Sequence, residues 1–153
     1  FYVAWLLGHL ILIREFPLDG RSWIYSLLLV TWLTDTAAYG VGMTMGKHRL
    51  SPRISPYKSV EGFLAGLFFA PAGVLICRLI FRLPITPVQS IILGFLMGVG
   101  GQAGDLVESL LKRNIRIKDS GTLFPGHGGV LDRCDSILFN APVMYYFIKV
   151  TIS

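Results

Sequence analysis

The sequence predicts an all-α protein, a polytopic bundle of transmembrane helices with about five spans. Composition is the first reason: hydrophobic residues make up 53% of the 153 residues and charged residues only 15%. The mean hydropathy of +0.61 is far on the apolar side for a soluble domain. Patterning is the second reason, because the apolar residues gather into runs separated by polar or proline-containing connections. We expect a single integral-membrane catalytic domain over residues 1–153.

The first two apolar runs are residues 1–13 and 22–43. The first run is short for a span, so we expect further helices before Phe1. The second is long enough to cross a bilayer at about 1.5 Å per residue and contains one carboxylate, Asp35. An acid within a span usually faces a polar cavity, which makes Asp35 a functional candidate. A helix–helix hydrogen bond or ion pair is the alternative.

The third and fourth spans are predicted over residues 60–81 and 88–111. Pro71 interrupts the third span and should kink it. The fourth span contains pairs of glycines four residues apart, a spacing that favours close helix packing. These pairs are Gly94 with Gly98 and Gly100 with Gly104.

Ionisable residues mark the end of the fourth span. Asp105, Glu108 and Lys112 follow one another at i, i+3 and i+7, so they share one helical face. A surface ion pair between an acid and Lys112 is the plainer explanation for part of this pattern. Two acids on one face at a membrane boundary also suit a binding site, and both interpretations stay open here.

The last span is expected over residues 130–152, and its first turns carry Asp132, Arg133 and Asp135. Acids suit a helix N-terminus because that end carries a partial positive charge. Such a capping role is the alternative for Asp132. It does not account for two acids, an arginine and the preceding His-Gly-Gly together.

Basic residues are distributed unequally between the connections, which predicts the topology. Two loops, about 44–59 and 112–129, are rich in them and are expected in the cytoplasm, next to the helix ends that carry the acids. The rich loops hold Lys47, Arg49, Arg53, Lys58, Lys112, Arg113, Arg116 and Lys118, whereas the opposite connections hold Arg14, Arg21, Arg78 and Arg82. We expect no nucleic-acid partner, because no basic stripe interleaved with aromatics lies outside the loops.

Carboxylates grouped with lysine and arginine at a membrane surface suggest a divalent cation that holds a polyphosphate. Mg²⁺ prefers oxygen ligands and typically takes one or two carboxylates plus substrate phosphate. Basic side chains neutralise the remaining oxygens, and a turn such as His127-Gly128-Gly129 lets backbone N–H groups come close. This pattern is typical of phosphoryl or nucleotidyl transfer. Zinc is disfavoured because His127 has no His or Cys partner at ligand spacing.

Specific motifs surround these residues. They are TDTAAY at 34–39, GKH at 46–48, SPYKSVEG at 55–62, GDLVES at 104–109, SLLKR at 109–113, KDSG at 118–121 and PGHGGVLDRCD at 125–135. Together these segments resemble the phosphatidate cytidylyltransferase (CDP-diacylglycerol synthase) family, and the stretch 109–135 resembles its C-terminal signature. Cys134 departs from the family, which usually has an aliphatic residue there. We interpret that difference as a tolerated packing change.

The resemblance implies transfer of CMP from CTP to phosphatidic acid, giving CDP-diacylglycerol and pyrophosphate for phospholipid biosynthesis. It implies that Mg²⁺ is needed, with K⁺ as a candidate second cation. The expected partners are CTP, phosphatidic acid and membrane lipids, and a homodimer is a candidate assembly. The expected place is the bacterial inner membrane, with the active site at its cytoplasmic face.

The resemblance also implies roles for individual residues, which we state as hypotheses. The metal ligands are Asp105, Asp132 and Asp135, with Glu108 and Asp119 as second choices. Catalytic roles are expected for Asp105, Lys118, Asp119, His127, Asp132, Arg133 and Asp135. Substrate binding is expected for Asp35, Lys58, Glu61, Lys112, Arg113, Gly128 and Gly129.

Other functions stay open at this point. A CTP-dependent lipid kinase of the dolichol or phytol type would cleave at the γ-phosphorus and release CDP rather than pyrophosphate. A CDP-alcohol phosphotransferase is a weaker rival, because its D-G-x-x-A-R run is not found. A transporter or a non-catalytic membrane scaffold would bind no CTP in the presence of Mg²⁺.

Overall fold

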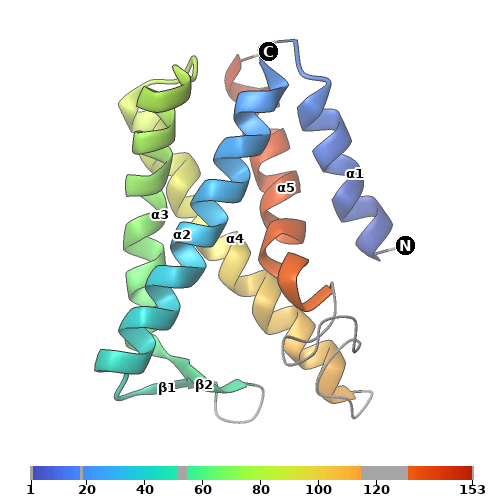
Figure 1. The fold of residues 1–153 in the computed structure, drawn as a ribbon. Coiled ribbons are helices and arrows are strands. Elements are labelled where there is room, and N and C mark those ends of the chain that lie inside the picture. The colour runs from blue at the N-terminus through green and yellow to red at the C-terminus, as the bar shows by residue number, and fades with distance from the viewer. Residues whose placement is uncertain (1, 18, 52–54, 115–130, 153) are drawn as a thin grey trace.

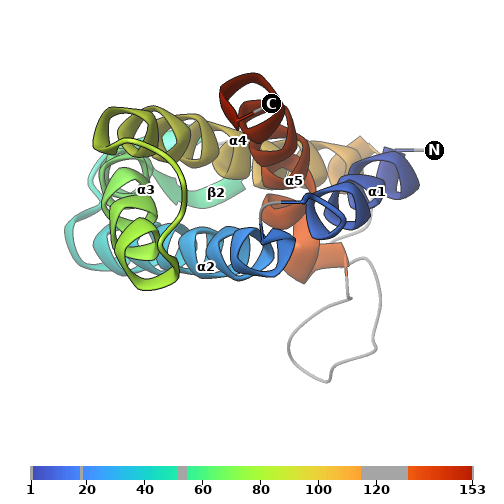
Figure 2. The same cartoon turned by 90° about the horizontal axis from the view of Figure 1, so that it is seen from above.

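The computed structural model confirms the all-α class and describes residues 2–17, 19–51, 55–114 and 131–152. The elements are α1 (Tyr2–Arg14), α2 (Gly20–Met45), β1 (Arg49–Ser51), β2 (Ser55–Ser59), α3 (Val60–Phe81), α4 (Pro87–Asn114) and α5 (Leu131–Ile152). The helices form a single bundle in which α2 and α4 are inclined in opposite directions (Figure 1). Seen from above, α3 and α1 lie at opposite edges, with α2, α4 and α5 between them (Figure 2).

The connection between α2 and α3 differs from the irregular loop expected over residues 44–59. β1 and β2 form an antiparallel hairpin in which Arg49 lies opposite Ser59 and Ser51 opposite Ser55. Pro56 within β2 is compatible with this, because both strands of a two-stranded sheet are edge strands, where a missing N–H is tolerated. Ser59 then ends the hairpin and caps α3, since its Oγ accepts a hydrogen bond from the Gly62 N–H at 3.1 Å.

Glycines allow α4 to pack directly on α3. A Cβ at Gly94 would lie 2.3 Å from the Cα of Pro71, and a Cβ at Gly98 would lie 3.2 Å from the Cβ of Ala70. The helix α3 continues through Pro71, so α4 approaches α3 beside the proline. The close packing predicted from the spacing of Gly94 and Gly98 is therefore confirmed.

The second pair of glycines packs α4 against α5. A Cβ at Gly104 would lie 2.7 Å from both the carbonyl oxygen of Asp135 and the ring of Phe139. A Cβ at Gly100 would lie 3.1 Å from the Asn140 Oδ1 atom. These contacts hold the C-terminal half of α4 against the first turns of α5, which is where the predicted acids lie.

The outer surface of the bundle is strongly apolar. Phe68, Leu79 and Val150 are 80%, 71% and 86% exposed. Among the described residues, length and composition identify two helices that could cross a membrane, Val60–Phe81 and Pro87–Lys112, with mean hydropathies of 2.1 and 1.4. The helices α2 and α5 are long enough, at 26 and 22 residues, but are not among these two. The chain is thus a helical bundle suited to membrane association.

The helix ends predicted to meet on one side do so. One end of the bundle, next to the β-hairpin, contains the C-terminal ends of α2 and α4 and the N-terminal ends of α3 and α5 (Figure 1). We call this the hairpin end. The C-terminus of the chain and the connections from α1 to α2 and from α3 to α4 lie at the opposite end.

Candidate active site

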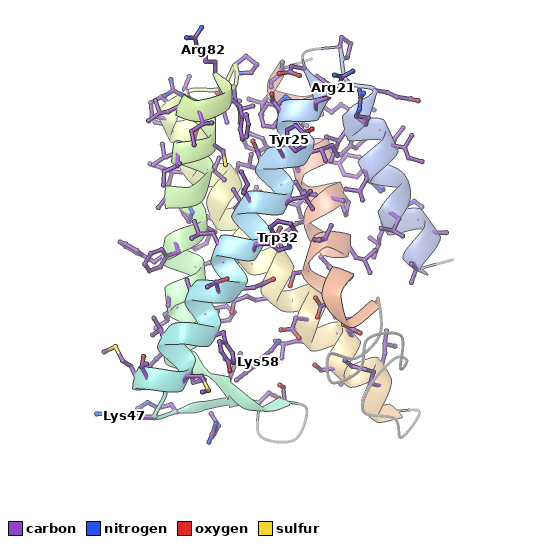
Figure 3. All side chains as sticks on the ribbon, viewed as in Figure 1. Arg21, Tyr25, Trp32, Lys47, Lys58 and Arg82 are labelled. Atoms are coloured by element: carbon purple, nitrogen blue, oxygen red, sulfur yellow. The ribbon has the colours of Figure 1, made fainter. Side chains whose placement is uncertain are left out.

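Lys58 is the centre of the polar contacts at the hairpin end. It is the last residue of β2 but one, and Figure 3 shows it beside α2 at the inner side of the hairpin. Its Nζ forms an ion pair with the Oδ2 atom of Asp105 on α4. The Lys58 and Asp105 side chains are 24% and 38% exposed. Because Ser59 caps α3, the position of Lys58 is fixed by the start of that helix.

Carboxyl groups from three helices surround this ion pair. Asp135 of α5 lies within hydrogen-bonding range of Glu108 on α4. Asp35 of α2 is close enough to Asp105 and Asp135 for their negative charges to repel one another, and the charge of Lys58 acts on Asp35 and Asp135 alike. Carboxylates this close to one another are stabilised by taking up a proton or by a nearby positive charge. Lys58 supplies such a charge to Asp35 and Asp135.

Glu108 belongs to the interior of this cluster. It is 2% exposed, and its Oε1 atom lies 3.4 Å from the Nζ of Lys112. The ion pair that the sequence offered as the plainer explanation is present, but Glu108 is buried and not on the surface. An ionised acid at such a position needs compensation by neighbouring charges or hydrogen bonds, and Lys112 supplies part of it.

Ser136 contributes to the site and was missed by sequence reasoning. Its Oγ donates a hydrogen bond to the Asp35 Oδ1 atom at 3.3 Å, and its N–H donates to the Asp135 Oδ1 atom at 2.6 Å. One turn further along α5, the Asn140 Nδ2 atom donates to the Thr31 Oγ1 atom of α2 at 2.9 Å. Positions 132, 136 and 140 share one helical face, and that spacing is the signal that could have identified Ser136.

Glu61 holds the connection that follows α2. Its carboxylate accepts hydrogen bonds from the N–H of Lys47 at 3.1 Å and the N–H of His48 at 3.2 Å. The His48 Nδ1 atom lies 2.7 Å from the Oε1 atom of Glu61. Glu61 therefore fixes the hairpin that carries Lys58, and substrate contact by Glu61 stays a prediction.

The structure brings together the predicted residues of α2, β2, α4 and α5 whose side chains it describes. They are Asp35, Lys58, Asp105, Glu108, Lys112 and Asp135. Other predictions lie outside the described residues, namely Lys118, Asp119, His127, Gly128 and Gly129. Arg113, Asp132 and Arg133 lie in described helices, but their side chains are outside the description.

The described acids can be tested for their fit to Mg²⁺. Within the described ranges, no three His, Cys, Asp or Glu side chains are grouped so as to hold a metal ion by themselves. Mg²⁺ does not need three, because it is usually held by one or two carboxylates together with water and substrate phosphates. Asp105 and Asp135, whose charges repel each other across the contact between α4 and α5, offer such a pair. The residues present fit Mg²⁺ held jointly with a polyphosphate.

A family model, described as the cytidylyltransferase family, matches residues 1–151. The chain belongs to this cytidylyltransferase family. Membership confirms the resemblance that the motifs between residues 34 and 135 indicated. It also covers the N-terminal helix α1, for which the sequence offered no motif.

Curated relatives agree with this assignment. The chain is 43% identical over 147 residues to the phosphatidate cytidylyltransferase of Bacillus subtilis (strain 168), covering 96% of this chain and 55% of the relative. It is 45% identical over 126 residues to that of Staphylococcus saprophyticus, covering 82% of this chain and 48% of the relative. It is also 41% identical over 130 residues to the uncharacterized protein YnbB of Escherichia coli (strain K12), covering 85% of this chain and 43% of the relative. The chain spans about half the length of the curated relatives it matches.

Proposed function

We propose that this chain takes part in the transfer of CMP from CTP to phosphatidic acid, which forms CDP-diacylglycerol and pyrophosphate. The observation that carries the proposal is the meeting of Lys58 with acids from three helices at one end of an apolar bundle. Relatives named phosphatidate cytidylyltransferase at 43% and 45% identity support it. The lipid-kinase, transporter and scaffold alternatives have no comparable support.

The proposed reaction is a substitution at phosphorus. An oxygen of the phosphatidic acid monoester attacks the α-phosphorus of CTP, and the bond from that phosphorus to the bridging oxygen of the β-phosphate breaks, so pyrophosphate leaves. The attacking phosphate is already ionised near neutral pH, so no strong base is needed. The barrier is then mainly repulsion between anions, which positioned positive charge lowers.

The described residues supply that charge and its positioning. Lys58 carries three N–H donors on its ammonium, so it can face Asp105 and still contact a phosphate oxygen. Ser136 holds Asp35 and Asp135 on the wall formed by α2 and α5. Lys112, beside the buried Glu108, offers a second cation for a polyphosphate. In the proposed site Lys58 and Lys112 bind phosphate oxygens, and Ser136 positions the two carboxylates.

Mg²⁺ would be held by Asp105 and Asp135, with Asp132 as the third predicted ligand and Glu108 and Asp119 as second choices. When bound, Mg²⁺ supplies neutralisation of the phosphate oxygens and a fixed orientation for them. The repulsion of Asp35 and Asp135 by Asp105 supports a requirement for a cation here. K⁺ stays a candidate for a second cation position.

We further propose that the hairpin end faces the cytoplasm across a bacterial inner membrane. The basic residues gathered in the loops at this end support that orientation. A cysteine introduced in place of Ser51 should then react with an impermeant maleimide only from the cytoplasmic side, and one in place of Arg82 only from the other side. The reverse labelling pattern would show the opposite topology.

A homodimer is also proposed. The molecular mass of the protein in detergent micelles tests it.

A product assay tests the proposed reaction. The assay uses liposomes that contain either the chain or a chimera. In the chimera the chain replaces the matching half of the Bacillus subtilis relative. Phosphatidic acid and CTP labelled at the α- or γ-phosphorus are then added. The proposal predicts α-label in the lipid phase, γ-label in pyrophosphate, and loss of both signals on chelation of Mg²⁺. Appearance of γ-label in the lipid would show a kinase. A chimera that binds no CTP in the presence of Mg²⁺ would favour the scaffold.

A further inference from the structure

A second polar feature lies at the end of the bundle opposite Lys58, where α1 ends and α2 begins. A pocket of about 240 Å³ is lined there by Arg14, Arg21, Ile24 and Tyr25. Figure 3 shows Arg21 and Tyr25 on the first turns of α2, far from Lys58 at the hairpin end. At about 1.5 Å per residue, the 26 residues of α2 span a length comparable to a bilayer with its headgroup layers. With the hairpin end at one membrane surface, as proposed above, the pocket would lie among the headgroups of the opposite leaflet.

The backbone builds this pocket through a close contact between the two helices. A Cβ at Gly20 would lie 2.4 Å from the carbonyl oxygens of both Ile13 and Arg14. Only glycine permits this approach, which sets the first turn of α2 directly on the last turn of α1. Arg14, the last residue of α1, and Arg21, the second residue of α2, are thereby held at one pocket.

The two arginines of the pocket have no salt-bridge partner among the described residues. Neither Arg14 nor Arg21 forms an ion pair or a side-chain hydrogen bond with another residue of the described part of the chain. Two acids lie in the connection between the helices, Glu15 and Asp19. Asp19 accepts a hydrogen bond from the Ser22 hydroxyl, and Glu15 is exposed. Two guanidinium groups are therefore available to an anion.

An apolar surface continues from the pocket towards the middle of the bundle. Arg21, Tyr25 and Leu29 follow at i, i+4 and i+8 and so share one face of α2. Tyr25 is 55% and Leu29 44% exposed. Tyrosine is enriched at the boundary between headgroups and acyl chains, and arginine pairs bind phosphate through charge-assisted hydrogen bonds. A ligand that matches the whole surface has an anionic phosphate head and apolar chains.

We propose that Arg14 and Arg21 bind the headgroup phosphate of an anionic phospholipid in the leaflet opposite the proposed active site. The acyl chains of that lipid lie along Tyr25 and Leu29. The bound lipid ties the end of α1 to the start of α2 and so stabilises the bundle. This site is separate from the proposed reaction, because it lies at the other end of α2.

Thermal unfolding of the purified chain in neutral detergent micelles tests the proposal without any assay of activity. Added phosphatidylglycerol should raise the unfolding midpoint, whereas phosphatidylcholine or inorganic phosphate at the same concentration should not. The Arg14→Gln/Arg21→Gln double variant should need about tenfold more phosphatidylglycerol for the same shift. The matched control is Arg82→Gln, an exposed arginine at the same end that does not line the pocket (Figure 3), and it should respond like the unsubstituted chain.

Two outcomes would overturn the proposal. If the double variant and the unsubstituted chain respond equally to phosphatidylglycerol, the lipid binds elsewhere. If inorganic phosphate alone gives the full shift, the pocket is a site for small anions. Arg14→Lys/Arg21→Lys keeps both charges and should retain most of the response. If the double glutamine variant does not fold, the single variants Arg14→Gln and Arg21→Gln make the same comparison.

Discussion

The two ends of the helix bundle are held by polar contacts of different range. Towards the hairpin end Ser136 contacts Asp35, 101 positions away in the sequence, and near the middle of the bundle Asn140 contacts Thr31, 109 positions away. At the opposite end the contacts close local turns, over three positions for Gln89 with Thr86 and seven for Arg78 with Ile85. A turn needs only local hydrogen bonds, whereas polar groups buried between helices are costly and usually serve function. This difference agrees with the proposed active site at the hairpin end.

The largest expected effect follows from removing the lysine at the centre of that end. Lys58→Met in the chimera should lower CMP transfer by about 10²- to 10³-fold, because a positioned charge that stabilises the transition state is lost. The unfolding midpoint should change little, since methionine keeps the apolar part of the side chain. Initial rates with α-labelled CTP and circular dichroism melting curves measure the two quantities.

Two matched lysine and arginine controls sharpen this prediction. Lys47 is an exposed lysine at the outer edge of the same hairpin end, and Arg82 is an exposed arginine at the opposite end (Figure 3). Lys47→Met and Arg82→Met should each keep the rate within about twofold, as is usual for surface substitutions away from a site. A loss from Arg82→Met as large as that from Lys58→Met would remove the distinction between the two ends.

The next largest effect concerns the contact that holds α3 and α4 between the two ends. Gly94→Ala places a Cβ 2.3 Å from Pro71, so the helices must separate, at a cost of about 1–3 kcal/mol in the free energy of unfolding. Gly8→Ala is the control, because a Cβ at Gly8 meets nothing within 4 Å. That change should be neutral or stabilise by up to about 1 kcal/mol, since alanine favours helix. Equal melting temperatures for the two variants would contradict the packing described.

The smallest expected effect is the coupling between Asn140 and Thr31, whose hydrogen bond joins residues 109 positions apart in the sequence. A double-mutant cycle of Asn140→Ala and Thr31→Ala should give a coupling energy of about 0.6 kcal/mol, the typical value for a hydrogen bond between membrane helices. Unfolding in mixed micelles measures it. Strict additivity of the two substitutions would show that this contact does not join α2 to α5.

Much of the fold could be predicted from the sequence, because helix ends are marked by local chemistry. The third span was predicted over 60–81 and is observed as Val60–Phe81, where Ser59 caps the helix. Close helix packing at Gly94 and Gly98 followed from their spacing, whereas α3 as the partner helix did not. The hairpin of β1 and β2 could not be predicted in this way, since two prolines and a polar composition suit an irregular loop as well as an edge strand.

The candidate site was predicted in part. Asp105, Asp135 and Lys58 were predicted because they are charged residues beside apolar spans, and the distribution of basic residues between the loops predicted that they lie at one end. Their partners could not be predicted, because the ion pair of Lys58 with Asp105 depends on how β2 sits against α4. Ser136 was missed for the same reason. A serine beside an acid has no distinctive local signal, and its role depends on the packing of α5 against Asp35.

The most direct test of the central claim is the Mg²⁺ dependence of CMP transfer in Asp135→Asn, with Glu15→Gln at the opposite end as the control. Glu15 is an exposed acid outside the proposed site. If Asp135 helps to hold Mg²⁺ with the triphosphate, its substitution should lower the rate about 10²-fold or more and raise the Mg²⁺ concentration for half-maximal rate, while Glu15→Gln changes neither. An Asp135→Asn enzyme with an unchanged rate and an unchanged Mg²⁺ requirement would contradict the account.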